Sequence, residues 1–261
     1  MVTGNEYTKW FANGEMSLDH LRHFTVQFSV FSNQFLLAAL NRVINADTLE
    51  SARESKEILM NELGVIYNKG GGGNGGGGAP SEEVKDREGD PALVSTEGTV
   101  DGGKFRFQAA HIEWLLRFGK PQGLTFTDIG KRRHGTDSTL HFCDELFRLY
   151  GSVDYNEAMG AAFAVENWAA AGFWKELIAG LEKIKADQIP DLPLAFFTWH
   201  DKIEDLHKEH VWEELNECYD NPQFQEEPFI REGKTMLDGV KTFWDGLNED
   251  RKKTETVAAA G

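Results

Sequence analysis

Apolar side chains recur at helical spacing from Leu18 to about Ala46, and this long stretch constrains the fold more than any other feature. The apolar positions are Leu21, Phe24, Phe28, Phe31, Phe35, Leu36, Ala39, Leu40 and Val43. Intervals of three and four residues place them on one broad face of a helix. Ser17 precedes the stretch and Asp19 lies in its first turn, as is typical of a helix N-terminus. So wide an apolar face has to pack against several neighbours, which predicts a helical bundle.

Further helical patterns account for most of the remaining chain. We expect helices over about 48–63, 137–150, 155–185, 194–219 and 230–247. Gly64 and Gly151 follow two of these stretches and are well placed to end them. No segment shows the apolar–polar alternation of a half-buried strand. The sequence therefore predicts an all-α fold of about six or seven helices.

A glycine run interrupts the helical pattern and divides the chain. Residues 70–78 read GGGGNGGGG, and an acidic stretch rich in Gly and Pro follows over 79–103. Glycine has the greatest backbone freedom and offers no side chain for packing, so we expect a flexible tether. The segment 104–120 has the pattern of an amphipathic helix that docks as a lid or a partner contact. The predicted organisation is a bundle over 1–68 and 137–250, an insertion over 69–136 and a polar tail over 251–261.

Charge and cysteine content exclude several classes of protein. The chain carries 27 basic and 43 acidic residues, a formal net charge of −16. This charge argues against nucleic acid or an anionic membrane as a partner. Cys143 and Cys218 are the two thiols in the sequence, too few for a disulfide framework. The sequence shows neither a signal-peptide pattern nor an apolar run of membrane-spanning length. We expect a cytoplasmic protein.

Three ionisable residues in the C-terminal half of the chain indicate a metal site. In the run WHDKIEDLHKEH, Glu204 follows His200 by four residues and His207 follows Glu204 by three. These steps put all three side chains on one face of a helix. Imidazole nitrogens and a carboxylate are a donor mixture that iron accepts. The spacing therefore predicts half of a non-heme iron site, although a solvated charged face has the same pattern.

Three other predicted helices each carry an ionisable residue in an apolar setting. Glu62 ends the helix over 48–63, His141 lies between Leu140 and Phe142, and Glu166 interrupts the sequence AAFAVENWAAAGFW. A buried charge needs a cation, a proton or a metal beside it. Taken singly, each has an ordinary explanation as a solvated, hydrogen-bonded or ion-paired side chain. Together with the trio they supply three carboxylates and three histidines from four helices, as in bundles that hold paired irons.

The order of these segments resembles one known family. ESKEILMNELG, TLHFCDELFRLYG, FAVENWAAAGFWKELIAGL and WHDKIEDLHKEH resemble the ligand-bearing helices of the heme-oxygenase-like di-iron oxidases and oxygenases. The resemblance implies a heme-oxygenase-like bundle and assigns iron-ligand roles along the chain. The implied ligands are Glu62, His141, Glu166, His200, Glu204 and His207. The insertion separates Glu62 from His141 more widely than is usual in the family, and Glu204 stands where an Asp is common.

The resemblance implies an O2-dependent oxidase or oxygenase with two Fe2+ per chain and a small organic substrate. Reactions of the family include amine N-oxygenation and oxidative C–C or C–H cleavage, and the substrate stays open. We expect Glu166 to bridge the metals and to be the catalytic carboxylate. Manganese at one position, an external electron donor and a homodimer also stay open. Arg132, Arg133 and Arg148 are candidates for holding a substrate carboxylate.

Two other hypotheses about the function compete with that of a di-iron oxidase. The first is a metal-independent enzyme of the same fold, either a cofactorless oxidase or a thiaminase-like enzyme with Cys143 as nucleophile. The second is a non-catalytic helical scaffold that recruits a partner through the insertion.

Overall fold

The computed structural model describes residues 4–68, 97–100, 103–107 and 109–260. Within these ranges it does not describe the side chains of 50, 54, 66–68, 97–107, 203–214, 217 and 256–260. The predicted glycine tether over 70–78 lies outside the described residues. The helices are α1 (Glu6–Ala12), α2 (Leu18–Ile44), α3 (Leu49–Glu62), α5 (His111–Gly119), α6 (Asp137–Tyr150), α7 (Tyr155–Ala169), α8 (Phe173–Asp187), α9 (Ala195–Asp220) and α10 (Glu226–Ala260). Short 3-10 turns cover Lys120–Gln122 and Arg132–His134.

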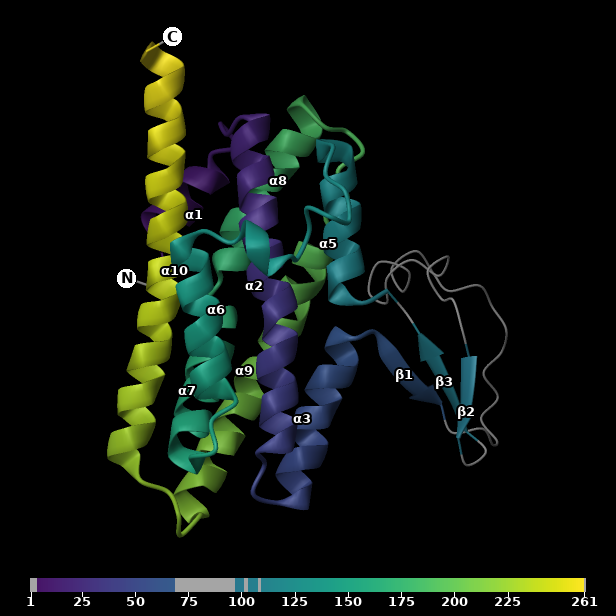
Figure 1. Cartoon of the computed structure of the whole chain (residues 1–261), viewed down its shortest axis with the longest axis vertical. Helices are drawn as coiled ribbons and strands as arrows, with labels where there is room; N and C mark the ends of the chain where they lie inside the picture. The colour runs from purple at the N-terminus through teal and green to yellow at the C-terminus, as the bar shows by residue number, and fades with distance from the viewer. Residues whose placement is uncertain (1–3, 69–96, 101–102, 108, 261) are drawn as a thin grey trace.

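Most of the described chain forms a helical bundle, as the apolar periodicity predicts (Figure 1). α2 packs against α3, α5 and α6, and α10 packs against α6 and α7. The centre of the bundle is strongly aromatic: Phe24, Phe28, Phe142, Phe197 and Phe243 are all nearly or fully inaccessible to solvent. Most predicted inward positions of α2 are buried or half-buried, but Leu40 is 44% exposed.

Side-chain caps explain where α2 and α3 begin. The Ser17 hydroxyl accepts a hydrogen bond from the His20 amide at 3.3 Å, so the predicted start of α2 is confirmed. Thr48 caps α3 in the same manner by accepting from the Ser51 amide at 3.1 Å. Such caps satisfy amide groups that have no partner inside the helix. At the other end of α3, Gly64 adopts a φ of 66°, a conformation that glycine adopts without strain.

The single long helix expected over 155–185 is wrong, because the chain breaks there into α7 and α8. Gly172 precedes α8 with a φ of 88°. This left-handed conformation cannot continue a right-handed helix, and glycine permits it at little cost. The break lets α8 take its own direction and pack against α1 and α9.

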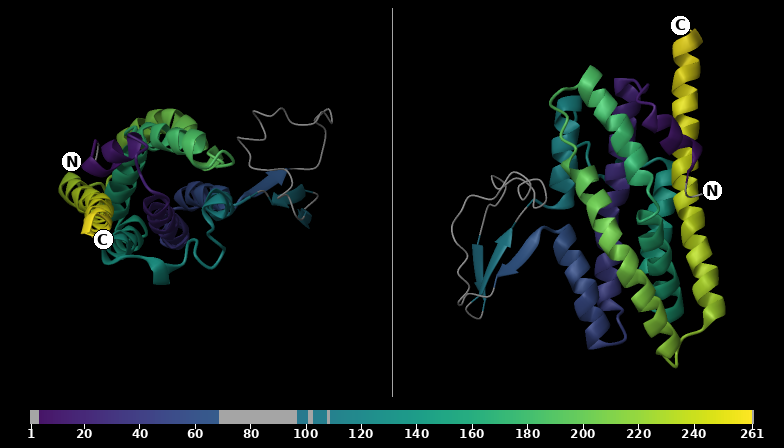
Figure 2. Two further views of the ribbon diagram at one scale, coloured as in Figure 1. Left: turned by 90° about the horizontal axis from the view of Figure 1, so that it is seen from above. Right: turned by 180° about the vertical axis from the view of Figure 1, so that it is seen from behind.

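A small antiparallel sheet, which the sequence did not predict, projects from the bundle between α3 and α5 (Figures 1 and 2). Its strands are β1 (Val65–Asn68), β2 (Glu97–Val100) and β3 (Gly103–Phe107), in the order β1-β3-β2. Val65 pairs with Phe107 and Asn68 with Lys104. The expected helix over 104–120 is therefore wrong in its first part, where β3 lies. Strand pairing between segments so far apart leaves little local signal in a short glycine-rich sequence.

The helical part of the expected insertion belongs to the bundle itself. α5 packs against α2 and α9, and its residues Trp114, Leu115 and Phe118 are 7%, 0% and 1% exposed. They join the same apolar core as the other helices. The helix expected to dock on the bundle therefore supplies core residues of the bundle itself.

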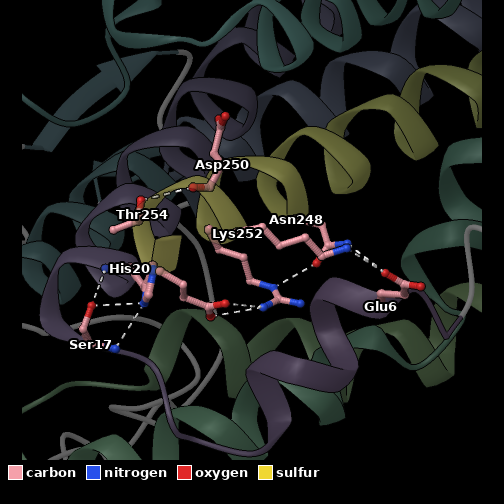
Figure 3. A network of polar contacts seen from close by, with 9 residues as sticks. Glu6, Ser17, His20, Asn248, Asp250, Lys252 and Thr254 are labelled. Carbon is pink, nitrogen blue, oxygen red and sulfur yellow. Dashed lines mark hydrogen bonds and ion pairs between the residues drawn. The ribbon is translucent and has the colours of Figure 1, made fainter. Parts of the chain in front are cut away.

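The expected polar tail over 251–261 is helical up to Ala260, because α10 continues past the predicted end at 247. Asn248 donates a hydrogen bond to Glu6 on α1 at 3.0 Å, as Figure 3 shows. His23 on α2 lies 3.4 Å from Asp250, and the Arg251 guanidinium lies 4.6 Å from the centre of the Trp10 ring. These contacts attach this part of α10 to α1 and α2. No helix in the described ranges is long and apolar enough to cross a membrane.

Candidate functional site

The carboxylate of Glu62, just before the small sheet in the sequence, contacts the imidazole of a histidine that lies just after the sheet. Glu62 is the last residue of α3, and His111 is the first residue of α5. Glu62 Oε2 lies 2.8 Å from His111 Nδ1, and the two side chains are 15% and 8% exposed. A carboxylate this far from water needs such a partner. The two residues bring one oxygen donor and one nitrogen donor to the same point.

His200 on α9 completes a group of three candidate ligands from three helices. The centres of the His111 and His200 rings lie 4.9 Å apart. His200 Nδ1 lies 2.6 Å from the carbonyl oxygen of Phe196. A carbonyl can only accept, so Nδ1 is the donor in this contact, and in a neutral ring the lone pair is then on Nε2. Metal-bound histidines commonly have their other ring nitrogen fixed by such a bond.

Aromatic side chains enclose this group. The Trp174 ring stacks on His200, with centres 4.8 Å apart and planes inclined by 24°. Phe196 lies 4.3 Å from His200 on its own helix. Trp199 contacts both histidine rings, at 5.1 Å from His111 and 4.9 Å from His200. These rings lower the local dielectric constant and strengthen the interaction between the Glu62 carboxylate and the His111 imidazole.

Glu204 and His207 lie on α9, four and seven residues after His200. Their helical backbone confirms the predicted spacing along one face of the helix, and their side chains lie outside the described part of the structure. Among the side chains that are described, no three or more of His, Cys, Asp and Glu lie so that they could hold a metal ion. Glu62, His111 and His200 therefore do not form a metal site by themselves, and a site at this point would need the further donors that α9 carries at positions 204 and 207.

Glu166 lies half-buried on α7. It follows Met159 by seven residues, which places both on one face of the helix. Arg42 on α2 reaches Met159, with 3.5 Å between Nη2 and Sδ, whereas Phe163 on the same face contacts Phe229 on α10. α7 also packs against α9. The position is compatible with the expected role of Glu166 but supplies no distance to the histidines.

The structure exposes His141 to solvent on α6, which does not favour the ligand role expected for it. α6 packs against α2, α7 and α10, whereas the candidate site lies on α3, α5 and α9. The apolar neighbours Leu140 and Phe142 are adjacent in sequence, but a helix turns adjacent residues by 100°. Asp137, the alternative on the same helix, is exposed as well.

In the structure His111, and not His141, lies beside Glu62. The sequence contains a pattern that indicates the burial of His111. Leu115 and Phe118 follow His111 by four and seven residues, and both are fully buried core residues of α5. Helical spacing puts His111 on that buried face. The contact between Glu62 and His111 is not evident from the sequence, because the two residues are far apart along the chain. The sheet between them brings them together.

The other predicted functional residues are occupied elsewhere. Arg132 pairs with Asp144 at 2.8 Å and Arg148 pairs with Glu145 at 2.5 Å, both on exposed surface. Arg133 donates to the Thr127 carbonyl at 2.8 Å. Burial raises the pKa of the Cys143 thiol to about 12. Since the thiolate is the nucleophile, Cys143 is poorly suited to nucleophilic catalysis at neutral pH.

No protein-family profile matches the chain, and no curated protein matches it either. The residues and their geometry are therefore the basis for a functional proposal.

Proposed function

We propose that the chain is a non-heme di-iron enzyme that uses O2 to oxidise a small organic substrate. The observation that carries the proposal is the contact of Glu62 with His111 beside His200, inside an aromatic enclosure and at one end of the face that bears Glu204 and His207. Carboxylates and imidazoles are donors that Fe2+ accepts. The proposed ligands are Glu62, His111, Glu166, His200, Glu204 and His207. His111 replaces the histidine first expected at 141.

The donor chemistry fits a metal centre in two respects. The Phe196 carbonyl holds the proton of His200 on Nδ1, so that Nε2 is the atom that can bind a metal ion. Glu62 lies close to an imidazole at a site with little solvent, where cations would offset the negative charge of several carboxylates. Bound Fe2+ would supply the electrons that activate O2.

The chain's own side chains would orient the ligands and exclude water. Trp174 holds the plane of His200 by stacking, and Trp199 contacts both histidine rings. A dry enclosure protects reactive oxygen chemistry from side reactions with solvent. The substrate would therefore be small and largely apolar near the metals, with amine N-oxygenation and C–C or C–H cleavage as the reaction types that the family resemblance implies.

Anaerobic iron binding tests the proposal directly. We expect about two Fe2+ per full-length chain, as in other carboxylate-bridged bundle sites, followed by O2 uptake with a transient visible absorption. His111→Ala and His200→Ala should each lose bound iron, and Glu166→Ala should lose the pairing of the two ions. His141→Ala is the matched control, since it removes an exposed histidine and should keep the iron content of the parent.

Equal iron binding and O2 uptake by the parent and His200→Ala would contradict the ligand assignment. If the parent binds no iron and consumes no O2 with ferrous ion in excess, the chain is not a di-iron oxidase. The hypothesis of a metal-independent enzyme with Cys143 as nucleophile predicts instead that Cys143→Ala abolishes an activity that needs no metal.

A further inference from the structure

A continuous series of aromatic rings starts at His200 and leads away from the candidate metal site. Trp174 stacks on His200, and the Phe173 ring centre lies 4.4 Å from that of Trp174. Phe173 in turn stacks on Trp168 at 4.9 Å, with planes inclined by 11°. These three rings come from the end of α7 and the start of α8, where the chain turns at Gly172.

The series continues through α10 to α1. Trp244 on α10 lies 5.6 Å from Phe173 and 6.4 Å from Trp168. Tyr7 on α1 stacks on Trp244 at 5.9 Å and lies 5.5 Å from Trp10. Trp10 is half-buried, whereas the rings between His200 and Trp10 are buried. The series thus crosses the bundle from the side of α5 to the opposite side, where α1 lies beside α10 (Figures 1 and 2).

Three buried tryptophans of this series have indole N–H groups without hydrogen bonds to any described residue, which costs free energy of folding. In the described part of the structure, the indole N–H groups of Trp168, Trp174 and Trp244 have no hydrogen-bond partner, although they are buried. Each buried unsatisfied donor costs about 1–3 kcal/mol. Phenylalanine would fill much of the same space without this cost. Indole differs from a phenyl ring in losing one electron far more easily, which gives the extra nitrogen a chemical use.

We propose that Trp174, Trp168, Trp244 and Trp10 form a route for single electrons between the metal centre and the surface at α1. This inference rests on the proposed function. If bound iron and O2 supplied an oxidant at this site while substrate was absent, Trp174 would give up one electron to it, and electrons from Trp168, Trp244 and Trp10 would refill each position in turn. The net change would be one electron delivered to the oxidant and one electron lost by Trp10. No bond to a heavy atom breaks.

The environment of each ring fits its place in this route. No acceptor lies beside the N–H groups of the three buried indoles, so an oxidised indole there keeps its proton and only an electron has to move. Trp10 is partly open to water, which can take the indole proton and retain the oxidation at this position. The Arg251 cation over the Trp10 ring disfavours the radical cation and so favours proton loss. A small thiol or ascorbate in solution would return one electron and one proton to Trp10.

The first test uses the full chain loaded with Fe2+ and mixed with O2 in the absence of substrate. Mass spectrometry then locates oxidised tryptophan, and visible absorption follows the tryptophan radical. We expect Trp10 to be the main oxidised tryptophan. Trp244→Phe should lose Trp10 oxidation and increase oxidation at Trp174. Trp114→Phe is the matched control: Trp114 is also buried with an unpaired N–H and lies near the site, but it is not in the series and should leave Trp10 oxidation unchanged.

Trp10→Phe gives a second variant at a half-buried position, where folding is less at risk. Removal of the terminal ring should increase oxidation at Trp244 and Trp168. Unchanged Trp10 oxidation in a folded Trp244→Phe protein would overturn the route. So would a Trp10→Phe protein whose buried tryptophans stay as unmodified as those of the parent.

A metal-free arm separates failure of the route from failure of the proposed function. Ultraviolet photoionisation removes electrons from buried tryptophans of the apoprotein without any metal. Oxidation products concentrated at Trp10, and their loss from Trp10 in Trp244→Phe, would support the route even if no iron binds. The same distribution of products in the parent and in a folded Trp244→Phe protein would overturn it whether or not the iron site exists.

Discussion

His111 Nδ1 lies 2.8 Å from Glu62 Oε2, although the chain between these residues leaves the bundle through β1 and returns through β3. This contact therefore joins the two points at which the bundle is interrupted. It also turns a carboxylate and an imidazole towards His200 on α9. One contact thus serves both the continuity of the fold and the candidate site.

Removal of His111 should destabilise the metal-free protein. His111→Ala leaves the Glu62 carboxylate, which is 15% exposed, without its imidazole partner, and loss of one member of a buried pair costs about 2–4 kcal/mol where some solvent access remains. Urea unfolding followed by circular dichroism measures the loss. His141→Ala, at an exposed position, should change the free energy of unfolding by less than about 0.5 kcal/mol. Equal effects of the two variants would contradict a buried Glu62–His111 pair.

Gly180 should be intolerant of a methyl group, because its backbone lies directly against the carbonyl of Phe11 on α1. A Cβ at this position would overlap the Phe11 oxygen, and backbone cannot move aside as a flexible side chain can. Gly180→Ala should destabilise the protein by about 1–3 kcal/mol, the usual range for overpacking, despite the higher helix propensity of alanine.

Gly172 provides the comparison for Gly180, because a Cβ there would meet no atom within 4 Å. Its φ of 88° nevertheless makes Gly172→Ala unfavourable by about 1 kcal/mol. Thermal unfolding of both variants measures the difference. A Gly180→Ala protein as stable as the parent would show that α1 does not pack closely on α8.

The stability of the protein should depend on the protonation of His23. Burial lowers the pKa of His23 below its ordinary value of 6.5, and the nearby Asp250 opposes this effect only in part. The unfolded chain then binds the proton more readily than the folded chain. The free energy of unfolding should therefore fall as the pH drops below about 6.5 and continue to fall until the folded pKa is passed.

Urea unfolding of the parent and of His23→Gln between pH 5 and 8 measures this contribution. The variant should lose part of the decrease at low pH, because glutamine does not titrate. His141→Gln, at an exposed position, should keep the pH dependence of the parent. A His23→Gln curve parallel to that of the parent would show that His23 is not responsible.

Cys143 should react slowly in the folded protein. Burial raises the pKa of its thiol to about 12, so very little thiolate exists at pH 8. Alkylation by iodoacetamide, followed by mass spectrometry at this residue, should be much slower in native protein than in urea-unfolded protein. Cys143→Ala should also keep the iron content and O2 uptake of the parent. Rapid native labelling together with a loss of activity in Cys143→Ala would favour a cysteine nucleophile.

Local patterns predicted much of the bundle correctly. Ser17 and Thr48 begin α2 and α3 as their capping chemistry requires, and α6 spans the predicted 137–150. The placement of His200, Glu204 and His207 along one helix also depends on local geometry alone. Such features follow from interactions within a few residues, which is the range that a sequence pattern records.

Tertiary structure decided which ionisable residues meet. His141 and His111 both stand among apolar neighbours in the sequence, but α6 turns His141 outward and α5 buries His111. The choice depends on how each helix packs against α2 and on the sheet that returns the chain to Glu62. The residues themselves determine the helices and supply the donors, because backbone hydrogen bonds and apolar periodicity act locally. Only the packing of distant segments selects the donors that share a point in space, since the free energy of burying a charge depends on neighbours that sequence distance does not reveal.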